Sequence, residues 1–202
     1  SVAEAAAAGA SLIVLPESFI PGYPSWSWRL AAGKDGAVIG QLHTRLLANA
    51  VDIANGDLSQ LCEAARVHGV TIVCGINECD RRNGGGTLYN SVVVIGANGA
   101  VLNRHRKLMP TNPERMVHGF GDASGLRAVD TPVGRVGALI CWENYMPLAR
   151  YSLYAQGVEI YVAPTYDTGE GWISTMRHIA LEGRCWVLGS GTALRGSDIP
   201  DD

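Results

Sequence analysis

The sequence predicts an α/β fold with a mixed β-sheet, and three features of its pattern support this. Short apolar runs typical of buried strands, such as SLIVL at 11–15 and RVGALI at 135–140, alternate with helical patterns. Two strand-like runs, 88–95 and 100–105, are joined by GANG at 96–99, and Asn-Gly is a strong hairpin signal. Such a hairpin argues against a purely parallel, doubly wound sheet.

The first half of the chain is predicted to hold three helices and two strands. We expect a helix end at 3–8 closed by Gly9, a strand at 11–15, a loop at 16–34, helices at 37–49 and 57–67, and a strand at 70–77. Asp57 is a plausible N-cap for the third helix, and Gly69 ends it.

The second half continues the alternation after the hairpin. We expect a long loop at 107–134, then a strand at 135–140, a helix at 147–156, a strand at 158–163, a helix at 172–182 and a strand at 186–190. The chain opens in a helix with no strand before it and closes on a loop sequence at 197–202. We therefore expect residues 1–202 to form a single, partial domain of a longer protein.

Composition limits the classes of function. Of the 202 residues, 47% are hydrophobic and 17% are charged, which fits one globular domain with a sizeable core. The net charge of −3 provides no basic field for nucleic-acid phosphates. No apolar run approaches the roughly 18 residues of a membrane span, and the first residues lack the basic region of a secretory signal. We expect a cytoplasmic protein without nucleic-acid or membrane partners.

The cysteines point to thiols rather than to disulfides or metal. The chain has five: Cys62, Cys74, Cys79, Cys141 and Cys185. An odd number is a poor disulfide framework, and reduced thiols fit a cytosolic enzyme. The spacing of Cys74 and Cys79 lies within the zinc-hairpin range, but no second pair follows, so structural thiols and no metal are expected.

Three residues that could carry chemistry follow predicted strands, where catalytic groups of α/β sheets gather. They are Glu17, Lys107 and Cys141. Each alone could be ordinary: a solvated acid, a solvated cation and a small core residue. Together they suit nucleophilic catalysis, because a helix N-terminus could favour a Cys141 thiolate, a carboxylate could take its proton, and the ammonium could hold the developing negative charge.

The segments around these residues resemble the catalytic segments of the carbon–nitrogen hydrolase (nitrilase) superfamily. They read LPESFIPGYP around Glu17, HRKLMPTNPER around Lys107 and ICWENYMPLAR around Cys141, and APTYDTGEGW and TMRHIALEGRCWVL follow. The resemblance extends over 9–197. The CWEN form resembles the nitrilase and cyanide-degrading branches rather than the amidase branches.

The resemblance implies a four-layer α-β-β-α sandwich, incomplete at both termini. It also implies roles: Glu17 as general base, Lys107 as electrostatic stabiliser and Cys141 as nucleophile. Glu114 matches a second glutamate that the family places near the cysteine and the lysine. A surface ion pair with Arg115 is the alternative for Glu114.

Four residues match positions near the substrate. Tyr23 matches a pocket-lining tyrosine, although a buried loop aromatic is an alternative. Trp142 and Glu143 follow the nucleophile, where a backbone N–H could help form an oxyanion site; pocket packing and a helix-start carboxylate are the alternatives. His118 stands where nitrilases often carry Trp, or is a loop histidine bonded to backbone.

The implied reaction is hydrolysis of a small organic nitrile to a carboxylic acid and ammonia through a thioimidate and a thioester, with no cofactor. The alternatives within the superfamily are a cyanide dihydratase or hydratase and an aliphatic amidase. A non-catalytic binding protein on the same fold is the alternative from another class. All three triad positions are filled, which argues against it.

The resemblance also concerns assembly. The superfamily forms homodimers that stack into larger, often spiral, homo-oligomers, and we expect this of the full-length parent. The segment 146–154 resembles a helix used in dimer contacts, although its apolar residues could face the domain's own core. The isolated chain is expected to be poorly stable or inactive, because missing strands would expose sheet edges.

Overall fold

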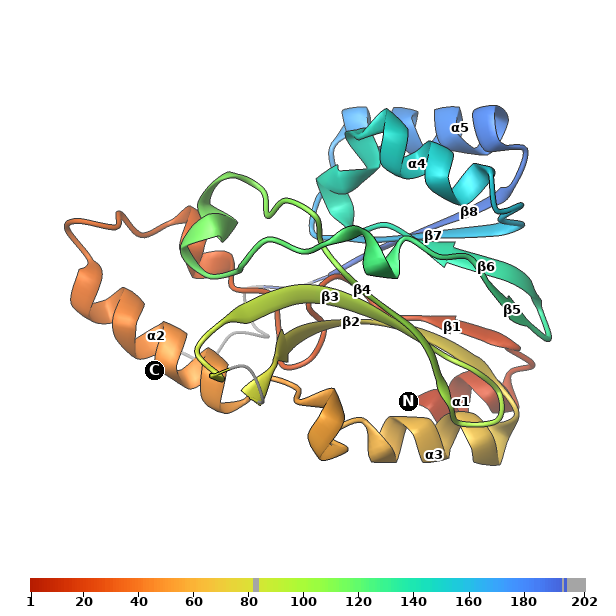
Figure 1. The fold of residues 1–202 in the computed structure, drawn as a ribbon, viewed down its shortest axis with the longest axis horizontal. Helices are drawn as coiled ribbons and strands as arrows, with labels where there is room; N and C mark the ends of the chain where they lie inside the picture. Colours follow the sequence, from red (N-terminus) through yellow and green to blue (C-terminus); the bar gives the residue numbers. More distant parts are fainter. Residues whose placement is uncertain (82–83, 194, 196–202) are drawn as a thin grey trace.

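The computed structural model describes residues 1–81, 84–193 and 195. Figure 1 shows two stacked β-sheets with helices on both outer faces, so the layers are α-β-β-α. This is the architecture that the resemblance implied. The predicted loop at 197–202 lies outside the described residues.

The first sheet has the strand order β1-β2-β3-β4. Its strands are β1 (Leu12–Val14), β2 (Thr71–Cys79), β3 (Leu88–Ile95) and β4 (Val101–Arg106). β1 pairs with β2 in parallel, whereas β2–β3 and β3–β4 are antiparallel, as the Asn-Gly signal predicted for the last pair. The helices α1 (Val2–Ala7) and α3 (Ser59–His68) cover its outer face (Figure 1).

The second sheet has the order β5-β6-β7-β8. Its strands are β5 (Val129–Thr131), β6 (Gly134–Ala138), β7 (Ile160–Thr165) and β8 (Trp186–Gly191), of which β6, β7 and β8 are parallel. The helices α4 (Pro147–Tyr154) and α5 (Glu170–Gly183) lie over its outer face (Figure 1).

Apolar side chains between the two sheets form the centre of the core. They come from inward positions of both sheets: Val73, Val92, Val94, Val136, Ala138 and Val162. Strand side chains alternate between faces, so the neighbours Ile72 and Cys74 pack instead beneath the helices. Each fully buried valine contributes roughly 1.5–3 kcal/mol relative to an exposed one. This sandwich fixes the positions from which the loops leave the sheets.

The remaining elements lie in the connections. They are α2 (Gly36–Ala48) and the 3₁₀ helices η1 (Ser25–Trp28), η2 (Ile53–Asn55), η4 (Asn112–Met116), η5 (Ala123–Gly125) and η6 (Cys141–Tyr145). No helix of the described ranges is long and apolar enough to cross a membrane. The five cysteines are free thiols.

Three predictions about elements were wrong in detail. The loop expected at 107–134 contains the short strand β5, whose exposed central Asp130 obscures any strand pattern. β7 ends at Thr165, two residues later than predicted, because its pairing with β8 continues to that residue. Asp57 does not cap α3: Leu58 is the N-cap, and the Asp57 carboxylate accepts from the backbone N–H of Asp52 at 2.8 Å.

Gly75 in the middle of β2 allows the loop after β1 to lie directly on the sheet. A Cβ atom at this position would collide with the carbonyl oxygen of Pro16 and lie 2.6 Å from the backbone nitrogen of Ser18. Both contacts are with backbone, which cannot move aside as a flexible side chain can. Glu17 lies between these two residues in the sequence, so its position depends on the absence of a side chain at Gly75.

We predict that Gly75→Ala destabilises the protein by about 1–3 kcal/mol, because the added methyl group overpacks the sheet. Gly40→Ala is the matched control: Gly40 is exposed in α2 with open space around it, so alanine should stabilise by roughly 0.5–1 kcal/mol. Urea unfolding measures both. Equal stability of the Gly75→Ala variant and the parent would contradict the close approach.

Candidate active site

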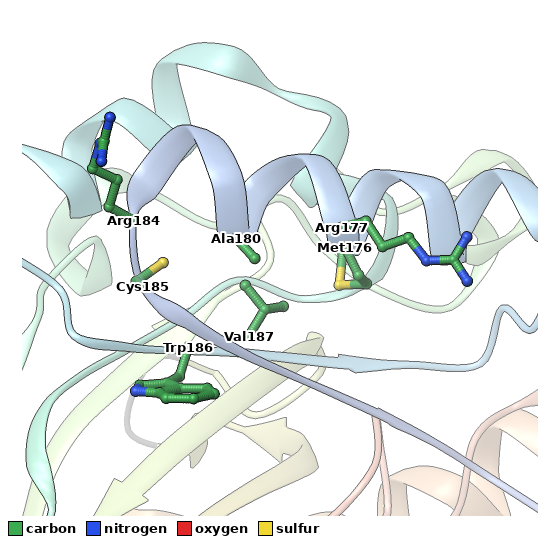
Figure 2. A pocket seen from close by; sticks show the side chains of 7 residues that line it. All are labelled: Met176, Arg177, Ala180, Arg184, Cys185, Trp186 and Val187. Carbon is green, nitrogen blue, oxygen red and sulfur yellow. The ribbon is translucent and has the colours of Figure 1, made fainter.

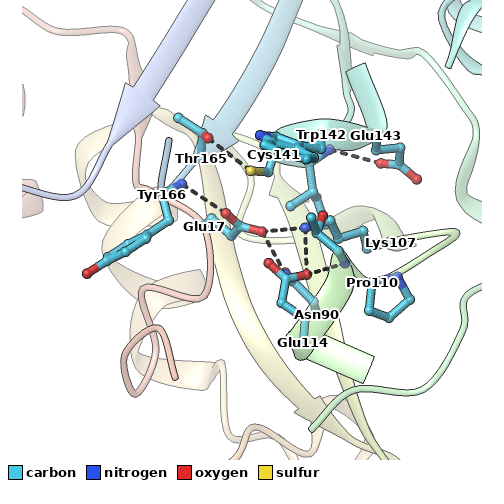
Figure 3. A network of polar contacts seen from close by, with 12 residues as sticks. Glu17, Asn90, Lys107, Pro110, Glu114, Cys141, Trp142, Glu143, Thr165 and Tyr166 are labelled. Carbon is cyan, nitrogen blue, oxygen red and sulfur yellow. Dashed lines mark hydrogen bonds and ion pairs between the residues drawn. The ribbon is translucent and has the colours of Figure 1, made fainter. Parts of the chain in front are cut away.

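The ends of four strands meet where the two sheets face each other. β1 and β4 run in the same direction in the first sheet, and β6 and β7 are parallel in the second. Glu17 and Lys107 therefore follow the C-terminal ends of β1 and β4, at the same end of the first sheet. Cys141 and Thr165 lie at the C-terminal ends of β6 and β7 in the second sheet. Figure 3 shows these side chains converging.

Lys107 lies fully buried between two glutamates. Its Nζ is 2.8 Å from Glu17 Oε1 and 2.8 Å from Glu114 Oε2 (Figure 3), and each of the three residues is at most 1% exposed. The alternative of a surface ion pair between Glu114 and Arg115 is thus wrong; Arg115 Nε donates to the carbonyl of Pro110. A buried ion of this kind persists only when it is paired and hydrogen-bonded.

The Glu17 carboxylate accepts hydrogen bonds on both oxygens. Asn90 Nδ2 donates to Oε1 at 2.8 Å, beside Lys107, and the backbone N–H of Tyr166 donates to Oε2 at 2.9 Å. Burial raises the pKa of Glu17 above its ordinary value, and the negative charge of Glu114 adds to this, although Lys107 opposes both. A buried carboxylate with a raised pKa is a stronger base than an exposed one.

Glu114 is held as an anion. Its Oε1 accepts from the hydroxyl of Tyr23 at 2.6 Å, and its Oε2 accepts from the backbone N–H of Thr111 at 2.8 Å. Burial alone would raise the pKa of Glu114, but the Lys107 ammonium and these hydrogen bonds outweigh it and lower the pKa. The pKa of Lys107 is raised because the two carboxylates outweigh its burial, so it stays charged. The two glutamates are thereby given different acidities.

Cys141 lies in a left-handed backbone conformation, with φ of 50°, at the start of η6. Such strain in a residue other than glycine clusters at functional sites. Burial and the Glu17 carboxylate raise the pKa of Cys141 to about 12, against the opposing effect of Lys107. The expectation that a helix N-terminus favours the thiolate was therefore wrong: the α-helix begins only at Pro147. The resting group is a thiol that needs a base.

A small cavity of about 250 Å³ opens beside the sulfur. Four aromatic and four polar residues line it: Tyr23, Trp28, Trp142 and Tyr166, and Thr111, Glu114, Cys141 and Asp167. The rings of Tyr23 and Tyr166 stack at 4.2 Å, and Trp142 Nε1 donates to Asp167 Oδ2 at 2.8 Å. The structure thus places the predicted pocket residues Tyr23 and Trp142 at this cavity.

His118 does not line this cavity in the described part of the chain. It is 3% exposed, and its Nε2 lies 2.8 Å from Oδ1 of Asn77. Burial lowers the pKa of His118 to about 4, so the ring is neutral. The expected place near the substrate and the alternative of a backbone bond are both corrected: His118 orients the amide of Asn77.

Glu143 is not among the residues that line the cavity, and its carboxylate faces the loops that carry Lys107 and Cys141. Its carboxylate accepts from the backbone N–H of Leu108 at 2.8 Å and of Ile140 at 2.9 Å, and His105 Nε2 lies 2.9 Å from both oxygens. Leu108 follows Lys107 and Ile140 precedes Cys141 in the sequence. Glu143 therefore ties together the two loops that carry these residues, and it has the capping geometry of a helix-start carboxylate.

Several residues of the site were not predicted as such. Asn90, Thr165, Tyr166 and Asp167 contact the glutamate, the sulfur or the cavity wall. The last three belong to the segment APTYDTGEGW, which the resemblance had marked as a block without assigning roles. Asn90 gave no signal, because it reads as one polar residue within an apolar strand.

A second hollow shares no lining residue with the cavity beside Cys141. It measures about 510 Å³ and lies between α5 and β8, with Met176, Ala180, Cys185, Trp186 and Val187 in its wall (Figure 2). Within the described ranges, no group of three or more His, Cys, Asp or Glu residues could hold a metal ion. At the smaller cavity, buried Glu17, Lys107, Glu114 and Cys141 have shifted pKa values and act on one another through their charges.

Comparison with known proteins identifies the family of this chain. The family model described as carbon–nitrogen hydrolase matches residues 1–198. The chain belongs to the carbon–nitrogen hydrolase family.

Relatives of this family member include named nitrilases. It is 44% identical, over 98% of its length, to a bifunctional nitrilase/nitrile hydratase NIT4A of Lupinus angustifolius, and it covers 56% of that protein. It is 43% identical, over 99% of its length, to an aliphatic nitrilase of Sinorhizobium fredii and covers 64% of it. The chain therefore spans little more than half the length of these relatives.

Solved structures share the fold of this carbon–nitrogen hydrolase. A carbon–nitrogen hydrolase from Helicobacter pylori G27 superposes with a TM-score of 0.69 at 21% identity, over 99% of this chain and 69% of that one. The NitN amidase from Nesterenkonia sp. AN1 superposes with a TM-score of 0.66 at 16% identity, over 94% and 68%. Likeness at this level of identity concerns the fold alone.

We predict that Glu143→Gln lowers the free energy of unfolding by about 1–3 kcal/mol, because an amide NH₂ would face one of the two buried backbone N–H groups. The rate of substrate turnover should fall as well, since the loops that carry Lys107 and Cys141 would be held less firmly by residue 143. Glu63→Gln is the control, because Glu63 lies on the surface of α3 and should change little. Urea unfolding that shows the same small change for both variants would contradict this role for Glu143.

Proposed function

We propose that this chain forms the catalytic part of a nitrilase, which hydrolyses a small organic nitrile to a carboxylic acid and ammonia. The observation that carries the proposal is the convergence of Cys141, Glu17 and Lys107 beside one small cavity. The names of the two nitrilase relatives reported above support a nitrile as the substrate. The chain spans only part of the length of these relatives, so the nitrilase activity is proposed for the whole protein to which the chain belongs.

The first half of the reaction forms a covalent bond to Cys141. Glu17 takes the thiol proton as the sulfur attacks the nitrile carbon, and one C–N π bond breaks. The electron pair goes to nitrogen, which receives a proton from Glu17, and the product is a thioimidate. The Lys107 ammonium stabilises the charge that develops on nitrogen.

The second half consumes two water molecules. Glu17 takes a proton from the first water as its oxygen adds to the thioimidate carbon, and passes this proton to the nitrogen. The C–N bond then breaks as the proton of the new hydroxyl group also moves to the nitrogen, so ammonia leaves and the thioester carbonyl forms. The remaining thioester is attacked by a second water, the C–S bond breaks, and Cys141 is regenerated as a thiol. Glu114 takes no proton in this scheme. Its charge holds Lys107 in place and keeps the pKa of Glu17 high.

Assembly and location remain predictions. Leu148 and Tyr151 on α4 are 84% and 66% exposed, which supports the use of this helix in contacts between copies of the whole protein. A homodimer or a larger, spiral homo-oligomer is proposed on this basis. The cytoplasmic location expected from the sequence is kept as a proposal.

We predict that Cys141→Ala abolishes ammonia release from nitriles, by more than about a thousandfold, because no other group replaces the nucleophile. Cys62→Ala, in α3 on the outer face of the first sheet, should leave the rate unchanged. The assay uses an aliphatic nitrile, an aromatic nitrile, cyanide and an aliphatic amide, and separates acid from amide among the products. Release from the amide alone, or equal release by both variants, would overturn the proposal.

The activity should be lost on the acid side at a pH above the ordinary glutamate pKa of 4.5, because Glu17 must be ionised to accept the thiol proton and its pKa is raised. Glu114→Gln removes a negative charge that raises this pKa, so the acid limb of the kcat/KM profile should move to lower pH. A profile that stays in place or moves to higher pH in this variant would contradict the assigned roles.

A further inference from the structure

The last residue of β7 touches the sulfur of the proposed nucleophile. Thr165 is 1% exposed, and its Oγ1 lies 3.1 Å from Cys141 Sγ (Figure 3). This is hydrogen-bonding distance for a hydroxyl that donates to sulfur. The backbone of β7, paired with β8 through Thr165 itself, fixes the position of the hydroxyl. Thr165 therefore reaches a reacting atom from a rigid strand.

A second hydrogen bond determines which way the hydroxyl points. The backbone N–H of Asp167 donates to Thr165 Oγ1 at 2.9 Å. The oxygen is thus an acceptor towards Asp167, and its single proton is left for the sulfur. The same Asp167 accepts from Trp142 Nε1 at 2.8 Å, and Trp142 follows Cys141 in the chain. A closed ring of contacts holds the donor against the nucleophile.

The sulfur needs such a donor. It is buried, and it lies close enough to the Glu17 carboxylate for that negative charge to disfavour a second one. Lys107 opposes this effect by its charge, but its ammonium donates hydrogen bonds to the two glutamates, each at 2.8 Å. The Thr165 hydroxyl adds a directed hydrogen bond to the thiolate, and hydrogen bonds to charged groups are stronger than those between neutral groups.

We propose that Thr165 is a further catalytic residue, whose hydroxyl stabilises the Cys141 thiolate as it attacks the substrate and again as it leaves the thioester. The inference rests on the proposed function only in taking Cys141 as the nucleophile. It assigns the threonine of the APTYDT segment a role at the sulfur, separate from those of Glu17 and Lys107.

Alkylation by iodoacetamide tests the contact without a nitrile. The rate of Cys141 modification is followed by peptide mass spectrometry over a range of pH in the parent, Thr165→Val and Thr165→Ser. Valine keeps the shape and removes the donor, so the rate at a fixed pH should fall about ten- to a hundredfold, and the pH profile should move upward. Serine keeps the hydroxyl and should stay close to the parent.

Two other thiols are internal controls in the same experiment. Cys62 is partly exposed in α3 and should react at one rate in all variants, whereas buried Cys74 should react only if the fold is lost. If Thr165→Val exposes Cys74, Thr165→Ala replaces it as a smaller variant without the hydroxyl. An unchanged Cys141 profile in a folded variant that lacks the hydroxyl, or a serine variant that behaves like valine, overturns the inference.

Turnover supplies an independent readout. In a variant without the hydroxyl, kcat should fall about ten- to a hundredfold with KM little changed, because the bond acts on the nucleophile. A rise in KM alone would mean that Thr165 only shapes the cavity through Asp167, and would overturn the inference. If the parent hydrolyses no nitrile while the alkylation pattern holds, the proposed function fails and the Thr165 contact stands.

Discussion

The buried ammonium of Lys107 is the interaction on which the site depends. A single cation between two carboxylates at 2.8 Å makes it possible for Glu17 and Glu114 to lie in an interior where neither would remain ionised alone. The difference between the glutamates follows from the balance between burial and the charge of Lys107. At Glu114 the Lys107 ammonium and the hydrogen bonds outweigh burial and lower the pKa, whereas at Glu17 burial outweighs Lys107 and raises the pKa.

Hydrogen bonds of buried side chains that do not line the cavity hold the loops of the site in position. Asn77 Nδ2 donates to the carbonyl of Gly22 at 2.9 Å, and the side-chain Oδ1 of Asn77 lies 2.8 Å from His118 Nε2. Glu143 joins the residues next to Lys107 and Cys141. Buried networks of this kind are costly when any member is removed, which explains why charged side chains without contact to the cavity lie so deep in the sandwich.

The sequence predicted the parts of this account that short patterns determine. Apolar runs and Asn-Gly located most strands, and three motifs marked Glu17, Lys107 and Cys141. The sequence patterns did not predict the contacts between residues far apart in the chain. The bond from Asn90 to Glu17 spans 73 positions and that from Tyr166 spans 149, and neither strand pattern nor motif carries that information.

The errors have the same origin. His118 and Glu143 lie beside the motifs in sequence, but their side chains point to buried partners rather than to the cavity. The prediction of a Cys141 thiolate rested on the helix that follows in the sequence. It left out the Glu17 carboxylate of the other sheet, whose charge raises the pKa of Cys141. Local sequence identifies which residues are present, and the packing of two sheets determines how their charges interact.

The most direct test of this account is a titration of the two glutamates by ¹³C NMR, with the side-chain carboxyl carbons labelled and assigned through Glu17→Gln and Glu114→Gln. The account predicts that Glu17 titrates above the ordinary value of 4.5 and Glu114 below it. A Glu114 that titrates above Glu17 would contradict the division of roles between a proton-accepting glutamate and a permanent partner of Lys107.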